Sequence, residues 1–229
     1  MNEIIFIIYC LVVVSSLLIA LRLSKEALIA LISLLWVLAN LFITQQIYLC
    51  RMTATSSDAL VVGALLGLNL LQEYYGKATA RSSIKISFYM LIFYTVVSLL
   101  HCAYIPHPSD QMHSLFKIIL TPMPRILIAS GITFILTQYL EYFLYGTLKQ
   151  YLAPYLVTRN IISISISQLF DTVVFTFLGL YGTVSYPGQI ILVSYGIKML
   201  TLLLSAPFIR LSRYIITDKR GKDTSNVHI

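Results

Sequence analysis

The sequence predicts an all-α integral membrane protein: a bundle of seven transmembrane helices that forms a single domain over residues 1–229. Hydrophobic residues make up 58% of the chain and charged residues only 11%, and the mean hydropathy is +0.84. A chain of this size and composition is too apolar for a soluble globule. Apolar stretches of 17 or more residues recur along it, and each would cross a hydrocarbon core of about 30 Å as a helix. The links between them are short, so no soluble domain is expected.

Gly and Pro mark several ends of the expected helices, as is typical of turns. Gly76 follows the third apolar stretch, Pro124 precedes the fifth, and Pro187 with Gly188 precedes the seventh. The expected spans are residues 4–21, 27–50, 58–75, 84–105, 125–148, 160–181 and 189–210, followed by a basic cytoplasmic tail over 211–229.

The distribution of Lys and Arg predicts the orientation, because cytoplasmic loops carry an excess of these residues. With the N-terminus outside, twelve of the 16 basic residues fall in inner loops and the tail. Only Arg51, Lys117 and Arg125 fall outside, and Lys198 lies within a helix. We therefore expect a multi-pass protein of the inner (cytoplasmic) membrane, with the N-terminus out and the C-terminus in. The net charge of +7 then faces anionic lipid headgroups, and no nucleic-acid partner is expected.

Polar side chains inside the expected helices are costly in a membrane and are therefore candidates for function. Asp171 and Lys198 lie near the midplane of two helices that the tight GTVSYPG turn makes antiparallel neighbours, so we expect them to pair. A purely structural ion pair is the alternative. With Lys198, polar residues from four other helices are expected to form one layer: Asn40, Asn69, Gln138, Glu141 and Gln168.

The spacing of these residues repeats one arrangement, an amide and a carboxylate three or four positions apart on the same helix face. Amides and carboxylates together offer donors and acceptors, which suits a planar ligand with a mixed hydrogen-bonding edge, such as a nucleobase. The pairs are Asn69 with Glu73, Gln138 with Glu141, and Gln168 with Asp171.

Small residues on two helices favour close helix packing rather than ligand binding. Gly63 and Gly67 lie one turn apart on the third expected helix, and Ser163 and Ser167 lie one turn apart on the sixth. We expect these positions to let neighbouring helices approach.

Motifs for catalysis and for cofactors are missing from the sequence. His101, His107 and His113 lie near an outer loop without a carboxylate-rich or Cys-rich setting, so we expect solvated histidines and no metal site. The chain lacks a G-x-x-x-x-G-K-[ST] loop, a G-x-S-x-G elbow and a carboxylate dyad on one helix. We therefore expect neither an enzyme nor a bound cofactor.

Two alternatives to an independent small-molecule transporter remain at this stage. The chain could be the substrate-binding membrane subunit of an ATP-driven vitamin-type uptake complex, with the ATPase on a partner. It could also be a seven-helix receptor that holds retinal on Lys198, although Trp36 is the one tryptophan available for a ring cage.

Several segments together resemble the queuosine precursor transporter family. They are QEYYGKATAR after an apolar helix, LAN at Leu38–Asn40, PRILIASG followed by Gln138, SQLFDTVVF at Ser167–Phe175, and Lys198 before an apolar run. The resemblance covers helices two to seven. It implies import of a 7-deazaguanine for tRNA modification salvage: queuine, or its nitrile or aminomethyl precursor (preQ0 or preQ1). It also implies substrate-binding roles for Asn40, Glu73, Arg125, Gln138, Arg159, Gln168, Asp171 and Lys198.

This chain departs from the family pattern at two positions. The family usually has an acidic residue where this chain has Asn69, and often has Lys where Gln45 aligns. Asn69 can hydrogen-bond a base edge but cannot neutralise an aminomethyl cation, so these departures imply a shift in substrate choice. Glu73 is expected either to receive the ligand or to anchor Lys77 or Arg81. The sequence leaves open the deazapurine carried, the energy coupling, and whether the protein is a monomer or a homo-oligomer.

Overall fold

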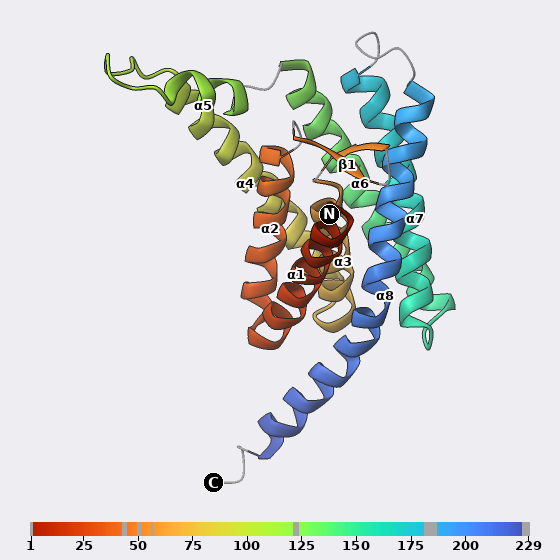
Figure 1. Cartoon of the computed structure of the whole chain (residues 1–229). Coiled ribbons are helices and arrows are strands. Elements are labelled where there is room, and N and C mark those ends of the chain that lie inside the picture. The colour runs from red at the N-terminus through yellow and green to blue at the C-terminus, as the bar shows by residue number, and fades with distance from the viewer. Residues whose placement is uncertain are drawn as a thin grey trace.

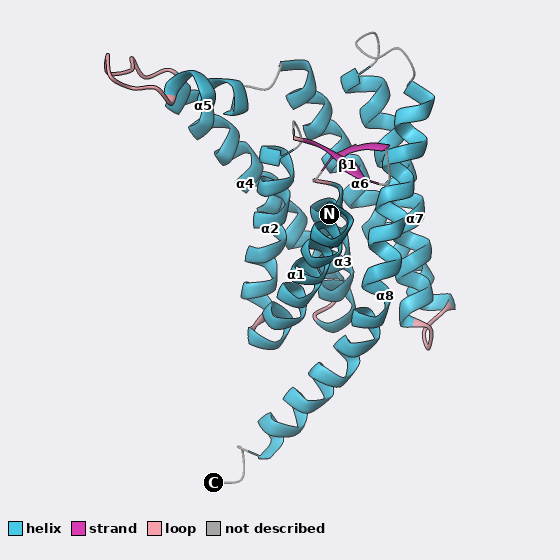
Figure 2. Ribbon diagram, in the orientation of Figure 1, coloured by secondary structure: helices cyan, strands magenta, loops and turns pink. Residues whose placement is uncertain are grey.

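The computed structural model describes residues 2–42, 45–49, 52–55, 57–120, 124–180 and 187–225. Most of these residues are in helices (Figure 1, Figure 2). The long helices are α1 (Asn2–Leu23), α2 (Lys25–Phe42), α3 (Asp58–Tyr74), α4 (Lys77–Cys102), α6 (Pro124–Tyr151), α7 (Leu156–Phe175) and α8 (Pro187–Ser225). The shorter elements are the strands β1 (Gln46–Leu49) and β2 (Met52–Thr55), helix α5 (His113–Leu120), and a π-helical turn, η1 (Thr176–Leu180), that continues α7.

Five of the described helices are long and apolar enough by themselves to cross a membrane. They are α1, α2, α4, the Leu156–Gly179 stretch of α7 and η1, and the Ile191–Tyr214 part of α8. The other two long helices are shorter or more polar, since α3 has 17 residues and α6 carries Gln138 and Glu141. The chain is therefore a multi-pass membrane protein. All seven predicted stretches overlap long helices, but only five qualify as spans on their own.

Helix α3 lies at the centre of the bundle. All but three of its 17 residues are buried, and it contacts α1, α2, α4, α6, α7 and α8. A Cβ on Gly67 would lie 2.7 Å from Ile32 Cγ1 and 3.0 Å from Leu17 Cδ2, and one on Gly63 would clash with Val13. A larger residue at either position would force side chains of α1 or α2 to move, which confirms the predicted close packing at Gly63 and Gly67.

The predicted helix over 27–50 is wrong in its last third. Helix α2 ends at Phe42, and residues 46–55 include an antiparallel hairpin in which Gln46 pairs with Thr55 and Leu49 pairs with Met52. Apolar composition does not distinguish a helix from a strand, whereas β-branched and aromatic residues such as Ile47 and Tyr48 favour strands. The hairpin crosses the bundle beside α8, where β2 contacts that helix (Figure 2).

Helices α4 and α8 extend furthest beyond their predicted bounds. Helix α4 begins at Lys77 rather than at 84, directly after Gly76, whose φ of 89° is a left-handed value that favours glycine. Helix α8 continues past 210 to Ser225 and projects from the bundle in Figure 1. Charged residues outside the hydrocarbon core are compatible with a helix, so an apolar run marks the part of a helix in lipid and not its ends.

Candidate functional site

Polar side chains gather in the interior between α3, α6, α7 and α8. The sequence predicts one layer around Asp171 and Lys198, but the structure divides its members between two clusters, and a third cluster around Glu73 and Arg159 lies beyond them along the bundle. Helix α7 shows the separation directly, because it contributes Arg159 to one cluster and Asp171 to another, about 18 Å apart along a helix that rises 1.5 Å per residue.

The first cluster surrounds the ammonium group of Lys198 on α8. Its Nζ lies 2.6 Å from Asp171 Oδ2 and donates to Thr172 Oγ1 at 3.0 Å. The other Asp171 oxygen accepts a hydrogen bond from Thr137 at 3.3 Å. Asp58 Oδ1 lies 3.9 Å from the same Nζ. The predicted contact between Asp171 and Lys198 is confirmed, and a second carboxylate stands opposite it. We call this group the Lys198 cluster.

Asp58 belongs to this cluster because α3 begins deep in the bundle. The hairpin occupies the chain between α2 and α3, and Leu49 of β1 is buried with Phe6, Ala59 and Ile197 in an apolar cluster. The hairpin therefore packs over the start of α3, beside the Lys198 cluster. From the sequence, Asp58 marks only a helix boundary, so its role was missed.

The second cluster, the Glu141 cluster, is built from fully buried side chains on α3, α6 and α7. Asn69 Nδ2 donates to Glu141 Oε1 at 2.6 Å and to Asn160 Oδ1 at 3.0 Å. Ser163 Oγ donates to the same Glu141 oxygen at 2.7 Å. These hydrogen bonds to Glu141 come from uncharged groups. Ser163 was predicted to serve packing alone, so the prediction missed this contact, and Asn160 was not predicted at all.

Gln138 on α6 and Gln168 on α7 lie between these two clusters along their helices. Both side chains are fully buried. Neither the amide nitrogen nor the amide oxygen of either residue has a hydrogen-bond partner among the described residues. Glu141 Oε2 and Asn69 Oδ1 are also buried without such a partner. A buried polar group without a partner costs about 1–3 kcal/mol, so this concentration of donors and acceptors is typical of a ligand site.

The third cluster, the Glu73 cluster, joins α3, α6 and α7 beyond Glu141. Arg159 Nη2 lies 2.6 Å from Glu73 Oε1, and Lys149 Nζ lies 3.1 Å from Glu73 Oε2. Tyr145 donates its hydroxyl to Glu73 Oε2 at 3.1 Å and accepts from Arg159 Nε at 3.3 Å. Arg159 Nη1 also donates to the Ala153 carbonyl at 2.7 Å. This network closes the polar interior at one end of the bundle.

One expectation about a charged residue needs correction here, and two site residues were missed. Among the described residues, Glu73 pairs with Arg159 and Lys149 and not with Lys77 or Arg81. Glu73 faces α6 and α7, where Lys149 and Arg159 reach its carboxylate, whereas the Lys77 side chain lies beside Gly146 on α6. Lys149 and Tyr145 were missed as site residues because basic and aromatic residues near a helix end are common in a membrane protein.

Two predicted site residues do not join the clusters, and the side chain of a third is not described. Asn40 donates its amide to the Trp36 carbonyl of its own helix at 3.0 Å. Gln45 is exposed, just past the end of α2. Arg125 lies in the first turn of α6, and its side chain falls outside the described residues.

A family model described as "Putative vitamin uptake transporter" matches residues 55–212, which is more than half of the chain and includes all three clusters. The chain belongs to this transporter family. A curated relative from Bacillus subtilis (strain 168), named "Probable queuosine precursor transporter", is 29% identical over 204 residues, covering 86% of this chain and 89% of the relative. No solved structure matches the chain. These findings confirm the family resemblance that the sequence carries. Within the matched region, α3, α6, α7 and α8 supply the side chains of all three clusters.

Proposed function

We propose that the protein imports a queuosine precursor, a 7-deazaguanine such as queuine, preQ0 or preQ1, across the inner membrane. The family and the name of the Bacillus subtilis relative support this class of solute. The observation that carries the proposal is the pair of buried, unpartnered amides at Gln138 and Gln168. Supporting acceptors are Glu141 Oε2 and Asn69 Oδ1.

The chemistry of a guanine-like edge matches these groups. Such an edge presents N–H donors, which carboxylate and amide oxygens accept, and a carbonyl, which an amide N–H serves. Each unpartnered group that the ligand satisfies removes a penalty of about 1–3 kcal/mol, so binding gains from polar contacts already desolvated in the protein. Asp171 and Lys198, at the edge of this region, would complete the contacts or hold α7 and α8 in position.

Transport would follow from alternating exposure of this site to the two sides of the membrane. We infer that all seven long helices span the bilayer, with the N-terminus outside and the C-terminus in the cytoplasm. The Glu73 cluster then lies toward the cytoplasm and the hairpin toward the outside. Release into the cytoplasm requires Glu73 and Arg159 to separate, so this ion pair acts as the inner gate.

The first experiment measures uptake of queuine, preQ0 and preQ1 in cells that cannot make queuosine precursors, with tRNA queuosine content as the readout. We expect queuosine to appear only when the protein is present. Unchanged tRNA in all three arms would refute the proposed solutes. Uptake that requires a co-purifying ATPase would instead assign the chain to an ATP-driven complex.

A second experiment tests the site itself through Gln138→Leu and Gln168→Leu. We expect each to weaken solute affinity about ten-fold or more, because it removes a partner of the ligand. Thermal stability should stay equal or rise, since each change removes buried unpartnered groups. Gln150→Leu, an exposed amide on α6, is the matched control. Lower stability with normal uptake would show that these amides serve the fold and not the ligand.

A further inference from the structure

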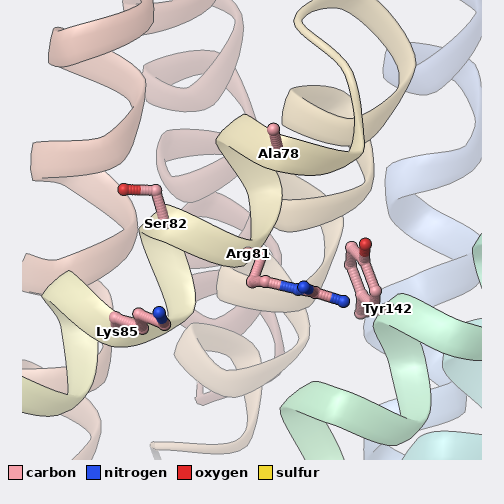
Figure 3. Close-up of a pocket in the computed structure, with 5 residues that line it drawn as sticks. All are labelled: Ala78, Arg81, Ser82, Lys85 and Tyr142. Atoms are coloured by element: carbon pink, nitrogen blue, oxygen red, sulfur yellow. The ribbon is translucent and has the colours of Figure 1, made fainter.

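A pocket opens at the end of the bundle near the Glu73 cluster. It lies between the first turns of α4 and the second half of α6 (Figure 3). Its volume is about 370 Å³. The lining comes from two helices and includes no member of the three clusters described above: Ala78, Arg81, Ser82 and Lys85 on α4, and Tyr142 on α6. Figure 3 shows Arg81 extending from α4 toward the Tyr142 ring, with Lys85 one turn further along.

The charge at this pocket is positive and uncompensated. Arg81 and Lys85 are one turn apart on α4, and Lys77 lies one turn before Arg81. Like charges at this spacing destabilise a helix. None of the three forms an ion pair with a described residue, and no described lining residue is acidic. Tyr142 holds the Arg81 guanidinium over its ring at 5.7 Å. An anion is the ligand that relieves this repulsion.

The surface beyond the pocket is apolar on both helices. Tyr89, Ile92 and Val96 are exposed and continue the Arg81–Lys85 face of α4 over the next three turns. Ile135 and Tyr139 are exposed on the turns of α6 that precede Tyr142. A ligand that fits both parts has an anionic head and long apolar tails.

We propose that this pocket binds the phosphate of an anionic phospholipid, with the acyl chains lying along the exposed faces of α4 and α6. Arg81 and Lys85 pair with the phosphate, and Ser82 donates a hydrogen bond to it. Tyr142 directly follows Glu141, and its carbonyl accepts a hydrogen bond from Gln72 on α3 at 3.3 Å. The lipid therefore ties α4 to α6 beside the polar interior. The inference does not depend on which solute the protein carries.

Native mass spectrometry of the delipidated, full-length protein in detergent tests this site. Phosphatidylglycerol and phosphatidylcholine with the same acyl chains are titrated separately. We expect one tightly bound phosphatidylglycerol per chain and no phosphatidylcholine bound with comparable affinity. The double variant Arg81→Gln/Lys85→Gln should weaken phosphatidylglycerol binding roughly 30-fold, and Lys85→Gln alone should weaken it about five-fold. These values follow from about 1 kcal/mol of binding free energy per basic residue.

Two matched variants separate the pocket from general surface charge. Lys25→Gln/Arg210→Gln removes two exposed basic residues outside the pocket and should leave binding unchanged. Arg81→Lys/Lys85→Arg keeps the charge and should retain most of the binding. Equal phosphatidylglycerol affinity in the wild type and in both Gln variants of the pocket would overturn the proposal. So would glycerol 3-phosphate displacing the lipid at equal concentration, because the pocket would then bind a soluble phosphate.

Discussion

Asn69→Asp replaces a hydrogen-bond donor by an acceptor at the centre of the Glu141 cluster. In the wild type, Asn69 Nδ2 donates to Glu141 Oε1 at 2.6 Å and to Asn160 Oδ1 at 3.0 Å. In the variant, an oxygen faces both acceptors, and two carboxylates stand in contact in a fully buried site. Buried carboxylates this close cannot both be ionised, so the pair has to hold a proton.

The two lost hydrogen bonds set the size of the effect. One is to a carboxyl group and one to an amide, which together contribute about 2–4 kcal/mol to stability. For a chain of this length that corresponds to a fall in Tm of roughly 4–16 °C. The folded variant holds a proton that its unfolded carboxylates release at neutral pH. Its stability therefore decreases as pH rises, and its difference from the wild type is larger at pH 8 than at pH 6.

The assay is thermal unfolding of the purified protein in detergent at pH 6 and pH 8. Gln150→Glu is the control, because it makes the same exchange of amide for carboxylate at an exposed position on α6. We expect a smaller loss of stability there. Equal Tm values for Asn69→Asp and the wild type at pH 8 would refute the Asn69–Glu141 contact.

The exchange Asn69→Asp/Glu141→Gln provides the decisive complement. It moves the carboxylate to α3 and the amide to α6, so an N–H again points at an oxygen across the same contact. We expect it to recover more than half of the stability lost in Asn69→Asp, a strongly non-additive result. Additive losses would show that the two residues act separately.

The single variant Asn69→Asp also tests substrate choice under the proposed function. Two carboxylates at 69 and 141 can be neutralised by the cation of preQ1, so Asn69→Asp should shift the ratio of inhibition constants toward preQ1 over preQ0 by about ten-fold or more. Competition against labelled queuine measures this ratio. An unchanged ratio would mean that residue 69 does not contact the substituent.

Lys198→Met leaves Asp58 and Asp171 facing each other without the ammonium group, so we expect it to reduce uptake at least ten-fold. It should be more damaging than Asp171→Asn, in which Asp58 still faces Lys198, and equal uptake in the two variants would contradict this. Glu73→Gln leaves the Arg159 guanidinium, which is 1% exposed, without its carboxylate, and should lower stability by about 3–5 kcal/mol. Glu73→Gln/Arg159→Gln, measured by the same unfolding assay, should recover part of that loss, and no recovery would count against a direct pair.

The sequence predicts the helices well and the hairpin badly, for the same physical reason. Apolar residues are required wherever a side chain meets lipid or the core, so runs of them locate all seven long helices, although not always their ends. Strand β1, which falls within the predicted helix over 27–50, is also largely apolar, with Ile47 and Leu49 in it. Hydrophobicity indicates that a residue is buried or faces lipid, but it does not indicate whether the backbone there is a helix or a strand.

The missed role of Asp58 follows from that hairpin. Depth along a helix can be counted from its ends, but only if the ends lie at the membrane surface. Because the hairpin takes up the chain after α2, α3 starts inside the bundle, and Asp58 reaches the depth of Lys198 in the middle of α8. The same displacement brings Asn69 to Glu141 and Glu73 to Arg159 along one short helix. The central position of α3 thus lets a single 17-residue helix contribute one polar side chain to each of the three clusters. A shift of α3 along its axis would disturb all three contacts together, so we infer that α3 is the element whose movement links the inner gate to the ligand site.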